Sequence, residues 1–300
     1  MARYTTLGIG GPADHFVSVK VEDQLKEAIR WAEAENIPWL VIGSGSNLLI
    51  SGRGFPGLVI KNEVAGIRRS GRKLTVKGGT ALQKLVDFAN RIGLAGFENL
   101  TGIPGTVAGA IYGNAGAYGQ TISDALISVT VFDGRVRRII RRSQCRFSYR
   151  ESIFKEKRGW FIIEAEFRPG LGDPKTLRAA SREVRAVRDV KYPPGLKCPG
   201  SFFKNLRAAD LPAVALRQIP RDKIRHGKVP AGYLLEEVGA KGKSRGAIRI
   251  TDYHGNLFFN EGGGTARDFW RLAEKYRRRV EEKFGIDLEP EVQLVGFGEH

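Results

Sequence analysis

The sequence predicts an α+β fold, and three observations lead to this prediction. Helical and strand-like patterns follow one another irregularly along the 300 residues, without the βαβα order of a doubly wound sheet. An almost uncharged, glycine-dense segment lies between Gly96 and Gly119, in a chain that is otherwise rich in charge. A proline-rich turn, Tyr192-Pro193-Pro194, follows a helical pattern and marks a boundary between two larger parts.

The first half of the chain mixes helices and strands. Apolar residues recur with helical spacing over 22–36 and over 81–91. Apolar or alternating runs predict strands at 39–42, 57–61, 73–77 and 160–167. Alternation on both sides of Asp133-Gly134 predicts a hairpin made of 128–132 and 136–140.

The second half begins with a strong helix signal. Asp173-Pro174 supplies an N-cap acceptor and a proline for the first helical position, and the pattern ends before Tyr192. Thr265 and Asp268 predict the start of a helix that reaches 284, and a last strand spans 292–295. We therefore predict a two-part domain (1–60 and 61–172), a connecting helix and turn (173–196) and a smaller α+β domain (197–300).

The charge balance limits the function classes. Lys and Arg exceed Asp and Glu by 17, which suits nucleic acids, acidic membranes or nucleotides as partners. No nucleic-acid motif is present, and no apolar run is long enough for a membrane helix. The N-terminus lacks an apolar signal core, so we expect a cytoplasmic protein. The two cysteines and four histidines show no ligand spacing, which argues against a metal site.

The first candidate binding loop follows the strand at 39–42. It departs from GxGxxG, because a leucine stands where the third glycine would be. Small residues with backbone N–H groups can form an anion-binding nest, although a tight turn between strands would use the same residue types. The loop consists of Gly43, Ser44, Gly45, Ser46, Asn47 and Leu48.

The second candidate loop spans 99–118. Glycine allows backbone to approach a bulky ligand closely. A disordered linker is the alternative, but Ile103, Val107 and Ile111 are apolar residues that a linker would not carry. Two backbone-rich loops in one domain suit a long dinucleotide.

A series of ordered motifs covers nearly the whole chain. Besides both glycine loops, the motifs are Thr5-Thr6-Leu7-Gly8-Ile9-Gly10-Gly11-Pro12-Ala13, Phe147-Ser148-Tyr149-Arg150-Glu151-Ser152-Ile153-Phe154, Gly200-Ser201-Phe202-Phe203-Lys204-Asn205, Pro230-Ala231-Gly232-Tyr233-Leu234, 254–260 and Leu288-Glu289-Pro290-Glu291-Val292. On these motifs the chain resembles the UDP-N-acetylenolpyruvoylglucosamine reductase family, whose FAD-binding fold is shared with vanillyl-alcohol oxidase. The absence of a long insertion between Arg150 and Ser201 is similar to the shorter subtype, which lacks an extra tyrosine loop.

The resemblance implies non-covalent FAD as cofactor and NADPH as co-substrate. It makes 1–60 and 61–172 the two FAD-binding subdomains and 197–300 the substrate domain. It assigns FAD contacts to the first loop, Gly43 to Leu48, and in the second loop to Thr101, Gly102, Ile103, Pro104, Gly105, Gly109, Asn114, Ala115 and Gly116.

The resemblance also implies the reaction. NADPH reduces the flavin, and a hydride then reaches the terminal vinyl carbon of an enolpyruvyl ether on a UDP sugar, in peptidoglycan precursor synthesis. Arg150 is expected to hold the substrate carboxylate, Glu291 to stabilise the enolate, and Ser201 to donate the proton. The substrate itself is expected to contact Tyr149, Lys191, Asn205, Tyr233 and Lys241.

Two other readings stay open on the sequence alone. A flavin-dependent alcohol or sugar oxidase of the same fold would share the glycine loops but lack the set of Arg150, Ser201 and Glu291. A basic nucleic-acid-binding module would show steeply salt-dependent DNA binding, but it gives the uncharged glycine segment no role. We expect a monomer whose partners are the nucleotide sugar and NADPH, with no nucleic acid and no membrane.

Overall fold

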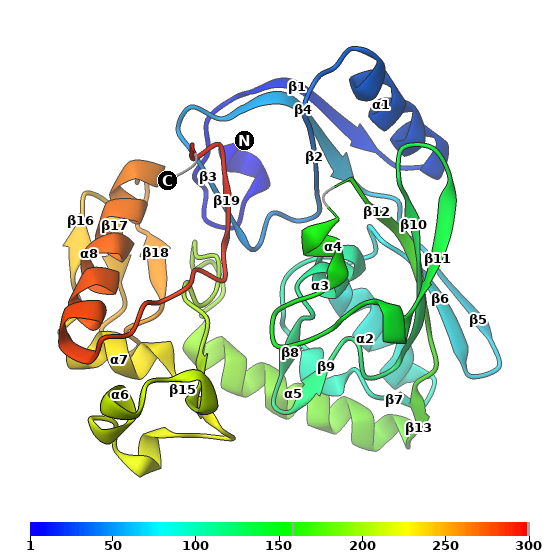
Figure 1. The fold of residues 1–300 in the computed structure, drawn as a ribbon. Helices are drawn as coiled ribbons and strands as arrows, with labels where there is room; N and C mark the ends of the chain where they lie inside the picture. Colours follow the sequence, from blue (N-terminus) through cyan, green and yellow to red (C-terminus); the bar gives the residue numbers. More distant parts are fainter. Residues whose placement is uncertain (158, 299–300) are drawn as a thin grey trace. The chain divides into compact units, whose positions relative to one another are not determined.

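The computed structural model describes residues 1–157 and 159–298, and these divide by packing into two units (Figure 1). The larger unit contains Ala13–Ser44 and Pro56–Pro194. The smaller unit contains Met1–Pro12, Gly45–Phe55 and Gly195–His300. Each unit has a hydrophobic core of its own, so each is described by itself.

A five-stranded antiparallel sheet forms the centre of the larger unit. Its strand order is β11-β10-β12-β6-β5. Val129 lies opposite Ala165, which lies opposite Val76, and all three are buried. This row of small apolar residues crosses the middle of the sheet. The strands are β5 (Ile67–Ser70), β6 (Lys73–Lys77), β10 (Leu126–Phe132), β11 (Arg137–Arg141) and β12 (Phe161–Phe167).

Helices α2 (Leu82–Arg91) and α5 (Pro174–Lys191) belong to the same unit. In α2 the apolar face is fully buried, as the helical spacing predicts. Helix α5 begins where Asp173 accepts a hydrogen bond from the N–H of Thr176 at 2.8 Å. It buries little apolar surface, and Ser181 ties it to Asn90 of α2 at 2.6 Å.

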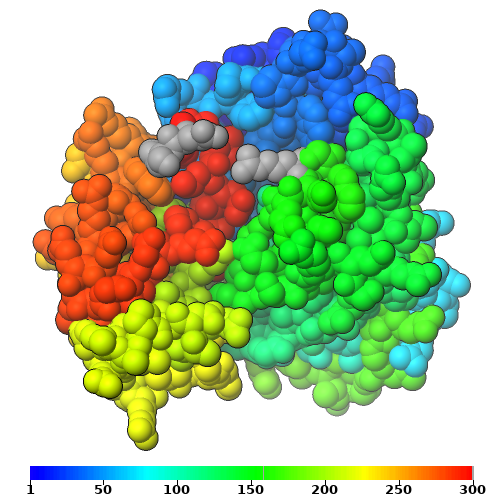
Figure 2. Space-filling view, in the orientation of Figure 1, coloured from blue at the N-terminus to red at the C-terminus, as the bar shows by residue number. Residues whose placement is uncertain are grey.

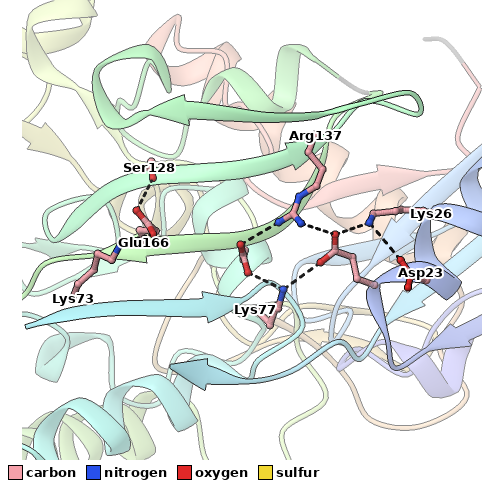
Figure 3. A network of polar contacts seen from close by, with 9 residues as sticks. Asp23, Lys26, Lys73, Lys77, Ser128, Arg137 and Glu166 are labelled. Carbon is pink, nitrogen blue, oxygen red and sulfur yellow. Dashed lines mark hydrogen bonds and ion pairs between the residues drawn. The ribbon is translucent and has the colours of Figure 1, made fainter. Parts of the chain in front are cut away.

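A three-stranded sheet of order β1-β4-β2 carries helix α1 (Glu22–Ala34). The strands are β1 (Ala13–Val19), β2 (Trp39–Ile42) and β4 (Phe55–Asn62), and β2 runs parallel to β4. Phe132 and Phe161 of the larger sheet share the core of this layer. Glu22 at the start of α1 also reaches Lys77 and Arg137 on that sheet, at 3.2 and 3.3 Å (Figure 3).

The smaller unit packs helices α7 (Ala231–Glu237) and α8 (Ala266–Phe284) with a sheet of β16 (Ser244–Arg245), β17 (Ile248–Ile250) and β18 (Phe258–Asn260). Thr265 caps α8 by accepting from the N–H of Asp268 at 3.0 Å. The charged face of α8 is exposed, and the helix lies within the orange to red part of the surface in Figure 2. Strands β3 (Leu48–Ile50) and β19 (Gln293–Val295) pair in parallel.

The remaining elements are short. They are β7 (Leu94–Ala95) with β13 (Gly170–Leu171), β8 (Gly116–Ala117) with β9 (Gln120–Thr121), β14 (Leu206–Arg207) with β15 (Lys228–Val229), and helices α3 (Val107–Tyr112), α4 (Ile153–Glu156) and α6 (Ala213–Arg217). In the described part of the chain, 3-10 turns occupy Ala2–Tyr4, Glu98–Leu100, Arg142–Gln144, Ala208–Asp210 and Arg221–Lys223.

The α+β prediction is confirmed, as are the hairpin at Asp133-Gly134 and the caps at Asp173 and Thr265. The glycine-dense segment is less irregular than its composition predicts, because α3 forms inside it. The division at 60, 172 and 196 stays a prediction; in the structure, 1–12 and 45–55 pack with the C-terminal residues. Within the part of the chain that the structure describes, no helix is both long and apolar enough to cross a membrane.

Candidate functional site

The segment Ser201–Lys204 lies between two other segments of the smaller unit. On one side, Ser201 bridges Leu257. On the other, the N–H of Glu291 donates to the carbonyl of Phe202 at 2.7 Å, and Phe203 bridges Pro290. The predicted proton donor Ser201 and the predicted enolate stabiliser Glu291 are therefore on neighbouring, hydrogen-bonded segments.

Asn47 joins the first glycine loop to the same place. Its Nδ2 donates to the carbonyl of Glu291 at 3.0 Å, and its own carbonyl accepts from Gln293 at 2.9 Å. Gly45 has a φ of +62°, and a β-carbon there would overlap the carbonyl of Tyr4. Only glycine fits this position without moving the backbone.

Asn205 is held at the start of α7, the helix that carries Tyr233. The Oδ1 of Asn205 accepts from the N–H of Ala231 at 3.1 Å, two residues before Tyr233. Burial raises the pKa of the Tyr233 phenol, and the nearby carboxylates of Glu237 and Asp222 raise it further. The phenol therefore stays a hydrogen-bond donor at neutral pH. Lys241 forms an ion pair with Glu236 at 2.9 Å, so this predicted phosphate ligand already has an anionic partner.

Arg150 lies in the larger unit and has an unusual backbone, with a φ of +60°. Such a conformation costs a non-glycine residue about 1 kcal/mol or more and needs support from its surroundings. Lys155 donates to the carbonyl of Arg150 at 2.6 Å and supplies part of that support. The guanidinium lies over the ring of Tyr149, with 5.3 Å between its Cζ atom and the ring centroid.

The structure brings the start of the first loop to the second loop. A β-carbon at Gly43 would lie 2.5 Å from the Oγ1 of Thr106, so the Gly43 backbone packs directly against the Thr106 side chain. Thr106 caps α3 by accepting from the N–H of Gly109 at 3.3 Å. Gly43 and Ser44 belong to the larger unit, whereas Gly45 to Leu48 belong to the smaller one.

Two family models match this chain, one in its N-terminal half and one in its C-terminal third. Residues 13–139 match the family model described as an FAD binding domain, and residues 192–295 match that of the UDP-N-acetylenolpyruvoylglucosamine reductase C-terminal domain. The reductase of Solibacter usitatus is 45% identical over 296 residues, covering 99% of this chain and 95% of that protein. That of Rubrobacter xylanophilus is 38% identical over 299 residues, covering 99% and 93%.

A crystal structure of the reductase from Thermus caldophilus superposes with a TM-score of 0.77 at 33% identity, covering 98% of this chain and 96% of that one. The chain belongs to the UDP-N-acetylenolpyruvoylglucosamine reductase family. Members of this reductase family are flavoprotein oxidoreductases of peptidoglycan synthesis that use FAD and NADPH, and the recognition of the family from the sequence motifs is confirmed.

The larger unit has features that fit a dinucleotide cofactor such as FAD. Among the described residues, five buried polar side-chain atoms lack a hydrogen-bond partner, and two of them, the Oδ1 of Asn114 and the Nε of Arg188, lie in or against the second glycine loop. Buried polar atoms of this kind are rare unless a ligand or water completes them. Asn114 lies in the predicted FAD segment, and its Nδ2 is held by the carbonyl of Ser148 at 2.9 Å.

Arg188 is a residue that the sequence reasoning missed. A β-carbon at Gly102 would lie 3.1 Å from its Nε, so the guanidinium rests against the second glycine loop. Burial is the main cause that lowers the pKa of Arg188, and repulsion from Arg185 and Arg150 lowers it further. The electrostatic influence of Tyr192 and Tyr118 raises it in part. A cation held beside other cations and against a glycine backbone suits an anionic ligand.

The burial of Arg188 is visible only in the structure. The buried residues of α5 are Leu177 and Ser181, and Arg188 continues that face at helical spacing. The side chain of Arg185, on the same face, is 43% exposed and pairs with Asp189, so a position on this face does not by itself identify a buried arginine.

Proposed function

We propose that this chain reduces UDP-N-acetylglucosamine enolpyruvate to UDP-N-acetylmuramate, with NADPH as the reductant and FAD as the resident cofactor. Family membership over nearly the full chain supports the substrate and the reaction. The structural observation that carries the proposal is the hydrogen bond between the Glu291 N–H and the Phe202 carbonyl. It places a carboxyl group and the hydroxyl of Ser201 on adjoining segments.

FAD would be held by the two glycine loops. Gly43 and Ser44, with Thr101 to Gly105 and Gly109, offer backbone at close range, and Asn114 offers a buried acceptor. Gly45 to Leu48, Ala115 and Gly116 complete the proposed set. When bound, FAD supplies the hydride chemistry, accepting a hydride from NADPH and transferring one to the vinyl carbon.

The protein groups manage charge and the proton. Addition of a hydride to the terminal vinyl carbon leaves an electron pair on the neighbouring carbon, delocalised into the carboxylate. Arg150 binds this carboxylate, and Glu291, in its protonated form, donates a hydrogen bond to the enolate oxygen. Ser201 gives its hydroxyl proton to the carbon that bears the electron pair, which completes the lactyl ether.

We expect the nucleotide sugar to contact five further side chains. Tyr233 donates through its neutral phenol, and Asn205 donates through its Nδ2, since its Oδ1 already accepts from Ala231. Lys191 and Lys241 supply positive charge for the diphosphate. The Nζ of Lys191 lies 5.2 Å from the centroid of the Tyr192 ring. Lys241 would exchange its partner Glu236 for a phosphate. Tyr149 lies beside Arg150.

The protein acts as a cytoplasmic monomer without nucleic-acid or membrane partners. In this proposal the net charge of +17 serves the polyanionic nucleotides. If DNA binding were the function, the affinity for duplex DNA would fall steeply as the salt concentration rises, and the nucleotide sugar would not displace the DNA.

The test of the reaction is anaerobic visible spectroscopy of the purified protein. The protein should be yellow, lose its flavin absorbance with NADPH, and regain it when the enolpyruvyl nucleotide sugar is added. A colourless protein that takes up no FAD, or a reduced protein that the sugar does not reoxidise, would disprove the proposal.

A further inference from the structure

The side chain of Asn256 makes a paired contact with the backbone of Phe203. Its Oδ1 accepts from the N–H of Phe203, and its Nδ2 donates to the carbonyl of the same residue, both at 2.8 Å. Asn256 is 1% exposed, so these bonds form away from water. An unpaired backbone group at such a place would cost about 1–3 kcal/mol.

The paired contact has a geometric cause. Phe203 faces Pro290 in a bridge whose hydrogen bonds come from its neighbours: Phe202 accepts from Glu291, and Lys204 donates to Glu289. The N–H and carbonyl of Phe203 therefore point to the opposite side, where regular pairing continues only as the bridge between Ser201 and Leu257. The amide of Asn256 takes the place of the missing strand.

Asn256 is itself held firmly. Its N–H donates to the Nδ1 of His254 at 3.1 Å, and its carbonyl accepts from the N–H of Phe202 at 3.1 Å. The His254 ring packs on α7, because a β-carbon at Gly232 would lie 2.9 Å from its Cε1. The amide is thus fixed to the element that carries Tyr233.

We infer that Asn256 is a positioning residue for proton transfer: it fixes the register of Ser201 relative to Glu291 through the Phe203 peptide. This inference rests on the proposed function, in which Ser201 and Glu291 act only when the substrate is reduced. A displacement of a reacting group by about 1 Å can slow a reaction about 100-fold, and loss of the amide would permit such a shift.

The test separates the two half-reactions of the FAD-loaded protein by stopped-flow absorbance. For Asn256→Ala we expect flavin reduction by NADPH within about twofold of the unaltered protein, and reoxidation by the nucleotide sugar slowed about 10- to 100-fold. In a Ser201→Ala background, Asn256→Ala should slow reoxidation little further, because it acts through Ser201. Equal slowing of both half-reactions, or full additivity, would overturn the inference.

Asn260→Ala is the matched control. Asn260 is a buried asparagine of the same unit, and its side chain donates to Leu7 and accepts from Gly262 and Gly264, at 3.1, 3.0 and 2.9 Å. It should lower stability without changing the ratio of the two rates. If it changed that ratio as strongly as Asn256→Ala does, the effect would be general loosening, and the inference would fail.

Hydrogen exchange keeps this inference separate from the proposed reaction. Amides of the peptide 200–205 should exchange faster in Asn256→Ala, and also in the milder Asn256→Asp, which keeps the acceptor but loses the donor. Unchanged exchange in both variants would overturn the positioning role whatever the enzyme catalyses. Failure of the unaltered protein to reduce the sugar would instead disprove the proposed function and with it the role in proton transfer, whereas faster exchange in the variants would still show that Asn256 holds the segment 200–205.

Discussion

The Nη2 of Arg150 donates to the carbonyl of Gly116 at 3.1 Å. The proposed carboxylate-binding residue is thereby tied to the glycine-dense segment that is proposed to hold FAD. Because Lys155 holds the backbone carbonyl of Arg150 at the same time, both ends of this residue are fixed. The guanidinium can then meet the substrate with little further loss of side-chain freedom.

Arg150→Lys keeps the charge but loses the planar, two-pronged donor. We expect FAD binding to persist, whereas reoxidation by the nucleotide sugar should slow about 100-fold, the scale of one lost transition-state donor. Single-turnover absorbance measures this step directly. Arg146→Lys is the control, since Arg146 forms an exposed ion pair with Glu156 at 2.7 Å, and it should leave the rate unchanged.

Ser201→Ala removes only the hydroxyl group, which is the proposed proton donor. Reduction by NADPH should stay within about twofold, while reoxidation falls about 100- to 10,000-fold, the usual contribution of a general acid. Ser201→Cys restores a dissociable proton and should recover part of the rate. Reoxidation of Ser201→Ala at the unaltered rate would assign the proton to another group.

Local signals explain why many elements could be predicted from the sequence. Helix starts at Asp173 and Thr265 depend on side chains that cap their own helix, and the hairpin at Asp133-Gly134 depends on its own turn. The pairing of β3 with β19 could not be foreseen, because Leu48 and Gln293 meet only through tertiary packing. The glycine content of 96–119 predicted a loop where the helix α3 forms. The prediction gave more weight to glycine than to the N-cap at Thr106.

The candidate site was predictable mainly through motif resemblance. Residue types alone could not show that Glu236 pairs with Lys241, or that Ala231 occupies an acceptor of Asn205. Arg188 was missed because a basic residue on a polar helix is usually solvated. Its importance depends on Gly102, which approaches it from a distant part of the chain.

Arg188→Met tests the role of the guanidinium against the glycine loop. A buried hydrogen bond from a charged donor is worth about 1.5–3 kcal/mol, so we expect FAD to bind about 10- to 100-fold more weakly. Fluorescence titration of the apoprotein with FAD measures this without turnover. Arg182→Met, on an exposed position of the same helix, should not change the affinity. Equal affinities for both variants would exclude Arg188 from the FAD site.

Asp133 gives the hairpin a pH-dependent contribution. Hydrogen bonds from the Val136 backbone and the Arg138 side chain, above all, lower the pKa of Asp133 to about 2. Because the folded pKa is below the unfolded value, the stabilisation is present above about pH 4 and is lost as pH falls towards about 2. Urea midpoints of the unaltered protein and Asp133→Asn should differ near neutral pH and converge in acid. A difference that does not change with pH would contradict this.

Glu22 connects α1 to the five-stranded sheet through two cations, Lys77 and Arg137, and it also pairs with Lys26 of its own helix; Figure 3 labels these three cations. Its carboxylate lies 2.8 Å from Lys26, 3.2 Å from Lys77 and 3.3 Å from Arg137, and its side chain is 16% exposed. Burial alone would raise the pKa of Glu22, but the hydrogen bonds from Lys26 and Lys77 and the charge of Arg137 lower it. The interaction is therefore favourable at neutral pH.

Glu22→Gln should lower the free energy of unfolding by about 2 kcal/mol, between the values for exposed and fully buried pairs. Asp23→Asn, one residue along, removes a carboxylate that is 95% exposed and 3.5 Å from Lys26, and it should change stability by less than about 0.5 kcal/mol. The loss in Glu22→Gln should vanish as the pH falls through the lowered pKa of Glu22. Equal effects of the two substitutions in urea unfolding would show that Glu22 is an ordinary surface charge.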